Sequence, residues 1–274
     1  MSHVVTRPQP STRPDRGPVG RVLVLVPTYN ERANLPRIIG RIRATGPDAD
    51  VLGLADDSPD GTGAIADDLA REDRQVRVLH RAAKEGLGAA YLAGFEWGLG
   101  RGYEVLVEID ADGSHPPERL PVMLEALHRA DLVIGSRWVR GGSVVNWPAY
   151  REALSRGSNL YTRLLLGMPV RDATAGFRVY RASALRTLGL GDDTAQGYFF
   201  QVDLTWRAVR AGLAIEEVPI TFVERETGAS KMSRDILKDS AARVTRRGID
   251  YRWGQVTGLA RRLRQEPTWH RLED

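Results

Sequence analysis

Apolar and polar positions are arranged in blocks along the first half of the chain. Nearly continuous apolar runs of strand length occupy residues 22–27, 51–55, 76–80, 104–110 and 131–136. Between them lie longer segments whose apolar residues recur three and four positions apart, the spacing of a helix with one buried face. Continuous apolar runs are typical of strands that are covered on both faces. The pattern therefore predicts an α/β fold with crossover helices and a mostly parallel central sheet.

The two ends of the chain have different patterns. Residues 1–20 hold four prolines and three arginines with almost no aliphatic pattern, which predicts a disordered leader. Residues 234–274 place aliphatic and aromatic residues at roughly helical spacing with arginines between them, which predicts an extension of amphipathic helices. We therefore expect one folded domain over residues 21–233, with a leader before it and a basic helical extension after it.

Composition excludes several kinds of chemistry. The 274 residues contain no cysteine, so disulfides, thiolate metal sites and cysteine nucleophiles are excluded, and the chain suits a reducing cytoplasm. No stretch approaches the roughly 18 consecutive apolar residues of a membrane-spanning helix. The net charge of +4 is compatible with nucleic acid, anionic lipid or phosphorylated ligands.

The positive charge is concentrated at the two ends. Residues 1–21 carry four arginines against one aspartate, and residues 234–274 carry ten lysines and arginines against six acidic residues, so the segment between them has a net charge of −3. Acidic clusters in that segment do not favour nucleic acid, and we expect no nucleic-acid partner. The basic extension instead favours lipid headgroups, so a membrane surface is the expected target, although a solvated helix that only covers the core fits the same pattern.

Polar residues follow several of the predicted strands, where ligands bind in an open parallel sheet. Asp110 and Asp112 come at the end of the fourth run, and carboxylates two positions apart on an extended chain point to the same side. With no cysteine or histidine cluster nearby, two oxygen ligands favour Mg²⁺ or Mn²⁺. His115, next to two prolines, is interpreted as turn structure.

Arginines follow later in the chain. Arg137 comes directly after the fifth run, and arginines on such loops suit the recognition of phosphate. Residues 149–167 mix leucines with arginines, a pattern that fits both a helix on a membrane surface and an ordinary docking helix.

Taken in order, the motifs resemble one known family. The motifs are PTYNE, DDSPDGTG, DADGSHPPE, GSRW, TAGFR, FQVDLTWRA and SKMS. Their order and spacing over roughly residues 21–235 are similar to those of the polyprenol (dolichol) phosphate mannose synthases, especially the short bacterial polyprenol monophosphomannose synthases, among the inverting family 2 glycosyltransferases. The resemblance implies the GT-A fold, a Rossmann-like nucleotide-binding sheet continuous with an acceptor-binding half, and makes residues 21–233 a catalytic domain.

The resemblance also implies roles for individual residues. It implies catalytic roles for Asp110, Asp112, Arg137 and Arg225, and a metal site of Asp110, Asp112 and Ser114. It implies nucleotide contacts from Pro27, Tyr29, Glu31, Asp56, Asp57, Ala111 and Lys231. It implies an acceptor-phosphate site at Arg137, Arg151 and Ser155, and sugar contacts from Gln201 and Asp203. Relatives usually have one more residue in the second motif, so which of Asp56 and Asp57 contacts the base stays open.

The implied reaction is the transfer of mannose from GDP-mannose to a polyprenyl phosphate, with inversion, at the cytoplasmic face of a membrane. The implied partners are these two substrates, the membrane surface and, as a further candidate, an integral membrane protein. A polyprenyl phosphate glucosyltransferase that uses UDP-glucose is the alternative within the family. A non-catalytic module that binds lipid or a membrane protein is the alternative from another class.

Overall fold

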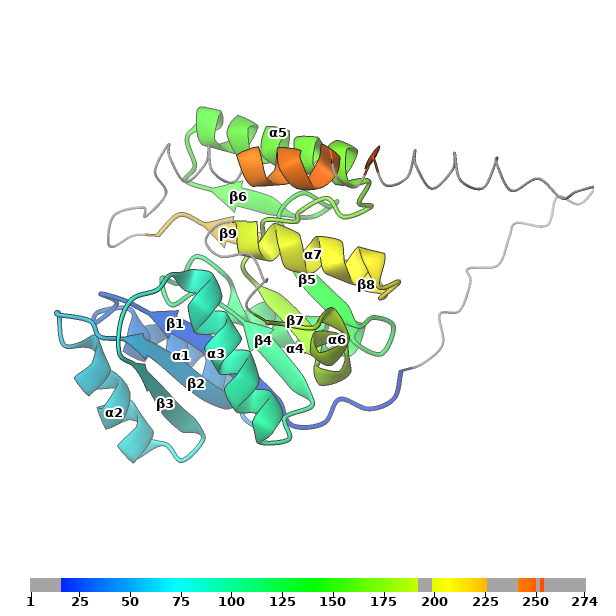
Figure 1. The fold of residues 1–274 in the computed structure, drawn as a ribbon. Helices are drawn as coiled ribbons and strands as arrows, with labels where there is room; N and C mark the ends of the chain where they lie inside the picture. Colours follow the sequence, from blue (N-terminus) through cyan, green and yellow to red (C-terminus); the bar gives the residue numbers. More distant parts are fainter. Residues whose placement is uncertain (1–15, 192–198, 226–240, 250–251, 254–274) are drawn as a thin grey trace, which may run out of the picture.

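A seven-stranded sheet forms the centre of the molecule (Figure 1). The structure, a computed structural model, describes residues 16–191, 199–225, 241–249 and 252–253. The strand order of the sheet is β3-β2-β1-β4-β7-β5-β8. The five apolar runs form β1 (Val22–Thr28), β2 (Asp50–Asp56), β3 (Val76–Arg81), β4 (Val105–Glu108) and β5 (Leu132–Ser136). β1 pairs in parallel with β2 and β4, and β2 pairs in parallel with β3, which confirms the predicted α/β architecture.

Helices cover both faces of this sheet. The helices between strands are α1 (Leu35–Thr45), α2 (Thr62–Glu72), α3 (Leu87–Gly100), the 3₁₀ turn η1 (Pro117–Arg119), α4 (Leu120–Ala126), α6 (Ala182–Leu188) and α7 (Phe200–Arg210). One apolar core joins α1, α2 and α4 to one face, and a second joins α3, α6 and α7 to the other. At Gly98 of α3 a Cβ atom would come within 2.8 Å of Leu106, so glycine allows the helix to lie close to the sheet.

Strand β7 (Arg178–Arg181) runs against its neighbours. It pairs antiparallel with β4 and with β5, while β8 (Ile215–Pro219) pairs in parallel with β5. Arg178 at the start of β7 lies opposite Glu108 at the end of β4. Residues that precede β7 therefore lie at the same edge of the sheet as residues that follow β4 and β5.

A smaller layer lies beyond this edge. It consists of the parallel pair β6 (Ser143–Val145) and β9 (Thr221–Val223), with the long helix α5 (Ala149–Leu166) after β6. Residues 241–249 are helical and lie beside α5 (Figure 1), where the hydroxyl groups of Tyr161 and Thr245 are 2.7 Å apart. Val244 is buried in the same core as α3 and α7.

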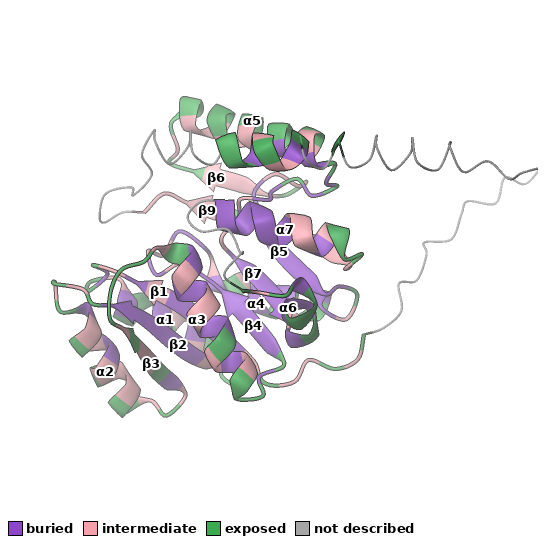
Figure 2. Ribbon diagram, viewed as in Figure 1, coloured by how far each residue is buried: buried purple, intermediate pink, exposed green. Residues whose placement is uncertain are grey.

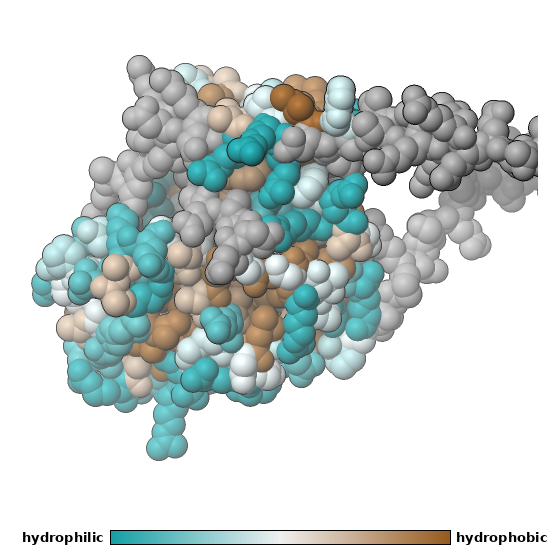
Figure 3. All heavy atoms as spheres, viewed as in Figure 1, coloured by the Kyte–Doolittle hydropathy of each residue, from teal (hydrophilic) through white to brown (hydrophobic). Residues whose placement is uncertain are grey.

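Helix α5 has an exposed outer face (Figure 2), and several large apolar side chains lie on it. Its buried residues are Asn159, Thr162 and Leu166, two of which are polar. On the opposite face lie residues that expose between 43% and 74% of their surface, here called the apolar stripe: Tyr150, Leu154, Leu160, Tyr161 and Leu164. Figure 3 shows apolar surface over α5 and the helix beside it, where Ile249 and Trp253 are also exposed. Among the described helices, none has the length and apolar composition to cross a membrane.

Both predicted end segments fall largely outside the described residues. Residues 16–20, which the sequence places in the leader, contact the domain: the Arg16 side chain pairs with Asp131, and the Gly17 carbonyl accepts a hydrogen bond from Arg181 at 3.0 Å. Residues 1–15, 234–240, 250–251 and 254–274 lie outside the description.

Candidate active site

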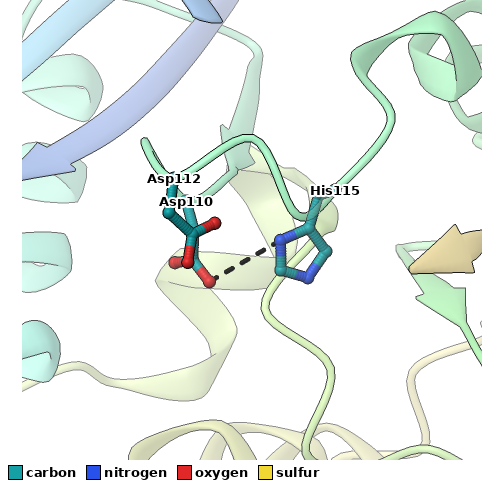
Figure 4. A group of neighbouring side chains, drawn as sticks. All are labelled: Asp110, Asp112 and His115. Atoms are coloured by element: carbon teal, nitrogen blue, oxygen red, sulfur yellow. Dashed lines mark ion pairs between the residues drawn. The ribbon is translucent and has the colours of Figure 1, made fainter. Parts of the chain in front are cut away.

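The acidic group predicted from the sequence lies at the carboxyl end of β4. Asp110, Asp112 and His115 each offer one ligand atom, and these three atoms lie within 4.8 Å of one another (Figure 4). The His115 Nδ1 atom is 3.6 Å from the Asp110 Oδ2 atom. The turn closes because the Ser114 amide donates to the Asp112 carboxylate at 3.0 Å and Gly113 adopts a φ of +74°, which glycine allows without strain.

The protonation states of this group differ. Burial and the neighbouring Asp112 charge raise the pKa of Asp110 to about 7, against a smaller opposing effect of Arg225. Although burial opposes it, hydrogen bonds from Ser114 and nearby positive charge leave the pKa of Asp112 below its usual value. Burial lowers the pKa of His115 to about 4, so its imidazole is neutral at pH 7 and keeps a lone pair for a ligand.

These residues fit a divalent cation. Two carboxylates and one neutral imidazole are donors that Mn²⁺ accepts, and Mg²⁺ is held by carboxylates together with phosphate oxygens. Ser114, the expected third ligand, is buried, and its hydroxyl lies 3.2 Å from the His115 Nδ1 atom. His115 was interpreted as turn structure, and its position three residues after Asp112 is the sequence signal that a third donor was available.

A buried polar network supports the acidic group from below. Glu108 is fully buried at the end of β4, and its Oε2 atom accepts a hydrogen bond from the Gln201 side chain at 2.9 Å. Burial raises the pKa of Glu108 to about 7. The structure thus places the Gln201 side chain, from α7, against Glu108, which lies two residues before Asp110 in the chain.

Residues predicted to contact the nucleotide follow β1 and β2. Pro27 is the last but one residue of β1, and Ala111 is buried next to Asp110 in the chain. The Lys84 ammonium group lies 3.8 Å from the centre of the Tyr29 ring. The Glu31 carboxylate accepts a hydrogen bond from Asn34 at 2.8 Å.

The two candidate base-binding aspartates differ in their surroundings. Asp56 is buried and forms an ion pair of 2.6 Å with Arg81. Asp57 is exposed and adopts a φ of +27°, an uncommon conformation for a residue with a side chain. Of the two carboxylates, that of Asp57 is therefore the more accessible to a ligand.

Arg137 is buried at the end of β5. Its guanidinium binds Asp172 through two hydrogen bonds of 2.8 and 2.6 Å and also donates to Thr174 at 2.9 Å. Burial opposes ionisation of Asp172, but the Arg137 charge holds its pKa below the usual value. Asp172 precedes β7, so the reversed strand brings this partner to the end of β5.

Arg151 and Arg225 are connected through Glu224, which pairs with Arg151 and precedes Arg225 in the chain. Arg151, in the first turn of α5, donates to Glu224 at 2.6 Å, and its guanidinium lies 4.6 Å from the centre of the Trp147 ring. Arg225 forms an ion pair with Asp112 at 3.0 Å. Ser155 lies one turn beyond Arg151 on α5 and is half-buried. Lys231 lies outside the described residues.

Asp203 is placed apart from the acidic group. It is fully buried on α7 and forms ion pairs with Arg207 and with Arg247. Its carboxylate thus joins two helices, and its predicted contact with a sugar stays a prediction. Sequence reasoning also did not identify Asp172 and Glu224, the acidic partners of the two predicted acceptor arginines.

The fold and the site are those of a glycosyltransferase of the GT-A class. The Glycosyl transferase family 2 model matches residues 23–189. The chain belongs to glycosyl transferase family 2, which confirms the resemblance found in its motifs.

Two relatives are similar over nearly their whole length. The undecaprenyl-phosphate mannosyltransferase of Micrococcus luteus is 56% identical over 243 residues, which cover 89% of this chain and 99% of that protein. The polyprenol monophosphomannose synthase of Mycolicibacterium smegmatis is 53% identical over 246 residues, which cover 89% of this chain and 93% of that protein.

Solved structures of a more distant protein share the fold. Glucosyl-3-phosphoglycerate synthase from Mycobacterium tuberculosis, in complex with UDP, has a TM-score of 0.60 at 20% identity, covering 83% of this chain and 80% of its own. The same protein with Mn²⁺, UDP-glucose and glycerol 3-phosphate has a TM-score of 0.59 at 21% identity, covering 82% and 77%.

Proposed function

We propose that this enzyme transfers mannose from GDP-mannose to a polyprenyl phosphate with inversion, giving polyprenyl phosphate β-mannose and GDP. The observation that carries the proposal is the meeting, at one edge of the sheet, of an acidic group (Asp110 and Asp112) and an arginine group (Arg137 and Arg151). The first suits a cation with a nucleoside diphosphate, and the second suits a phosphate acceptor. The names of the two mannosyltransferase relatives support mannose as the sugar and polyprenyl phosphate as the acceptor.

The proposed reaction needs no strong general base. A phosphate monoester loses its second proton at a pKa of about 6, so the acceptor oxygen is already anionic near pH 7. That oxygen forms a bond to the anomeric carbon from the face opposite the diphosphate. The bond between the anomeric carbon and the diphosphate breaks, and GDP leaves with the electron pair.

The residues of the site therefore act by positioning and charge. We assign Arg137 and Arg151 to the acceptor phosphate, and Arg225 to the departing diphosphate, where their positive charges offset the repulsion between two anions. Asp110 and Asp112, with His115 beside them, would hold Mg²⁺ or Mn²⁺. When bound, the ion would neutralise the charge that develops on the diphosphate.

We also propose that the enzyme docks on the membrane that holds its acceptor. The apolar stripe of α5 faces outward over a helix whose inner face is partly polar, the reverse of an ordinary surface helix. The same helix carries Arg156, which also pairs with Glu152 at 2.8 Å, and Arg163, and positive charge near the stripe suits anionic headgroups. The proposed location is the cytoplasmic face of the membrane, with the protein bound peripherally.

A transfer assay tests the activity. Purified protein with Mn²⁺ receives radiolabelled GDP-mannose or UDP-glucose together with a short polyprenyl phosphate, and the lipid product is extracted and counted. We expect transfer from GDP-mannose. Transfer from UDP-glucose but not from GDP-mannose would show that the enzyme is instead a polyprenyl phosphate glucosyltransferase. No transfer from either donor would refute the proposal that the protein is an enzyme.

A further inference from the structure

Two adjacent residues bind the two halves of the site. The Glu224 carboxylate accepts a hydrogen bond of 2.6 Å from Arg151, which we assign to the acceptor phosphate. The next residue, Arg225, pairs with Asp112 of the acidic group at 3.0 Å. Both contacts are largely shielded from solvent, with Arg151 and Arg225 each exposing 19% of their side chains. One short segment therefore connects the cation site with the acceptor site.

The backbone of this segment is fixed on the same two sides. The Val223 amide donates to the Ser114 carbonyl, in the turn that carries Asp112, at 3.0 Å. The Glu224 amide donates to the Val145 carbonyl at 3.0 Å, at the end of the strand that leads into α5 and Arg151. A displacement of residues 223–225 would therefore alter contacts in both the cation site and the acceptor site.

In this arrangement each ligand-binding charge is neutralised from within the protein. The Arg225 guanidinium pairs with Asp112, one of the carboxylates that we assign to the cation. The Glu224 carboxylate pairs with Arg151, which we assign to the acceptor phosphate. Like charges repel, so a phosphate cannot bind Arg151 favourably while Glu224 stays in place.

We infer that binding of the nucleotide changes both contacts together. If Asp112 binds a cation, its ion pair with Arg225 is weakened, Arg225 becomes available to the diphosphate, and the neighbouring Glu224 is drawn from Arg151. Arg151 keeps its position because its guanidinium packs at 4.6 Å over the Trp147 ring. Arg137 is also paired with a carboxylate, that of Asp172, through two hydrogen bonds, and the inference concerns the Arg151 contact alone.

We propose that Glu224 is a positioning residue that blocks Arg151 until cation and nucleotide have bound, so that donor binding opens the acceptor site. This inference rests on the proposed function, because it takes the acceptor to be a phosphate bound at Arg151. Linkage makes the effect reciprocal: a bound acceptor strengthens nucleotide binding by the same factor. For a coupling of ordinary size we expect that factor to be about tenfold.

The test measures binding rather than turnover. Farnesyl phosphate, a short polyprenyl phosphate, is titrated into the full-length protein by calorimetry, first alone and then with saturating Mn²⁺ and GDP. The wild-type protein is compared with Glu224→Gln, which keeps the shape of the side chain and removes its charge. Glu216→Gln is the matched control, since Glu216 pairs with Arg129 at 2.8 Å and is exposed to a similar extent, 27% against 23%.

The proposal expects a specific pattern. In the wild type and in Glu216→Gln, Mn²⁺ and GDP tighten farnesyl phosphate binding by about tenfold. In Glu224→Gln, binding without nucleotide is already as tight as in the nucleotide-bound wild type, and Mn²⁺ and GDP add less than about twofold. Thermal unfolding establishes that all three proteins are folded.

Three other outcomes would overturn the inference. If the wild type binds both ligands but independently of each other, or if Glu224→Gln keeps the full coupling, Glu224 does not block the acceptor site, and the proposed function stands. If the wild type binds neither Mn²⁺ with GDP nor farnesyl phosphate, the proposed function itself fails and the inference fails with it.

Discussion

The Arg247 guanidinium donates to the Asp203 carboxylate at 2.7 Å and so attaches the helix of residues 241–249 to α7. Asp203 is fully buried and also accepts from Arg207 at 2.8 Å. The same helix α7 carries Gln201, which binds Glu108 beneath the acidic group. The helix of residues 241–249 is therefore connected to the buried Glu108–Gln201 contact through one turn of α7.

Replacing Asp203 by Asn should destabilise the protein. The change weakens two charge-assisted hydrogen bonds in a buried position, which we expect to cost about 2 kcal/mol of unfolding free energy. For a chain of this size that loss lowers the Tm by about 4–8 °C. Thermal unfolding of Asp203→Asn, Arg247→Gln and the double variant provides the measurement, and the effects should be less than additive. An unchanged Tm with a raised KM for the sugar nucleotide would instead indicate a role in sugar binding.

Replacing Asp112 by Asn should strongly weaken the binding of Mn²⁺ or Mg²⁺. Residues that only support a metal ligand lower metal affinity or activity by about 10–100-fold when changed, so loss of a ligand should cost more than about 100-fold. Mn²⁺ binding is followed by electron paramagnetic resonance, and transfer is followed with labelled donor. Asp48→Asn, at an exposed position, is the control and should behave as the wild type. Full Mn²⁺ affinity in Asp112→Asn would refute the assignment.

Mn²⁺ affinity should rise with pH. The pKa of Asp110 is raised to about 7, and a carboxylate must lose its proton before it can bind a metal. Below about pH 7 the apparent affinity should therefore rise by up to about tenfold per pH unit and then level off. Calorimetry in buffers of different ionisation enthalpy should detect about one released proton per bound ion at pH 6. No proton release there would contradict the raised pKa.

The metal-free protein should show the opposite trend in stability. The folded-state pKa of Asp110, about 7, is above its ordinary value of 3.8, so the fold favours the protonated carboxyl. This contribution is complete below about pH 4 and is lost as the pH rises through about 7. In the presence of a chelator, Asp110→Asn should therefore lose less stability than the wild type between pH 5 and pH 7.5. Parallel curves for the two proteins would count against the prediction.

Polar substitutions in the apolar stripe should weaken membrane binding. In Leu154→Gln/Leu164→Gln two exposed leucines lose the ability to enter the acyl region, and we expect vesicle partitioning to fall by about tenfold or more. Flotation with vesicles that contain anionic lipid is the measurement. Val122→Gln, at an exposed position on α4, is the control and should float as the wild type does. Equal flotation of the double variant would show that α5 does not contact lipid.

The parallel half of the fold could be predicted because its signal is local. Strands β1, β2, β4 and β5 are buried and largely apolar, whereas the edge strand β3 is only partly buried. The first four of these five strands are each followed by a segment of helical periodicity. Strand β7 gives no such signal. It is four residues long with an arginine at each end, and Arg178 is buried only because backbone carbonyls and Thr205 accept its hydrogen bonds. Those partners come together only in the folded chain.

The same distinction applies to the site. Asp110 and Asp112 could be paired from their spacing, because they are two positions apart directly after a predicted strand. The structure does bring them together, but through a turn at residues 111–112 rather than an extended segment. The acidic partners of the arginines could not be predicted from spacing, because Asp172 is 35 positions from Arg137 and Glu224 is 73 positions from Arg151. A sequence motif identifies a charged residue that could bind a ligand. Only the fold shows which oppositely charged residue of the protein already pairs with it.

Because β7 runs antiparallel to its neighbours, sequence variation just before this strand should affect substrate choice. In a fully parallel sheet, the residues that precede a strand lie at the edge away from the ligand, and their exchange is usually neutral for substrate choice. Here Asp172 and Thr174 precede β7 and bind the arginine assigned to the acceptor. We therefore expect residues 172–177 to belong to the substrate-determining part of the chain. Among members of this family that use different acceptors, sequence differences there should vary with the acceptor rather than with stability.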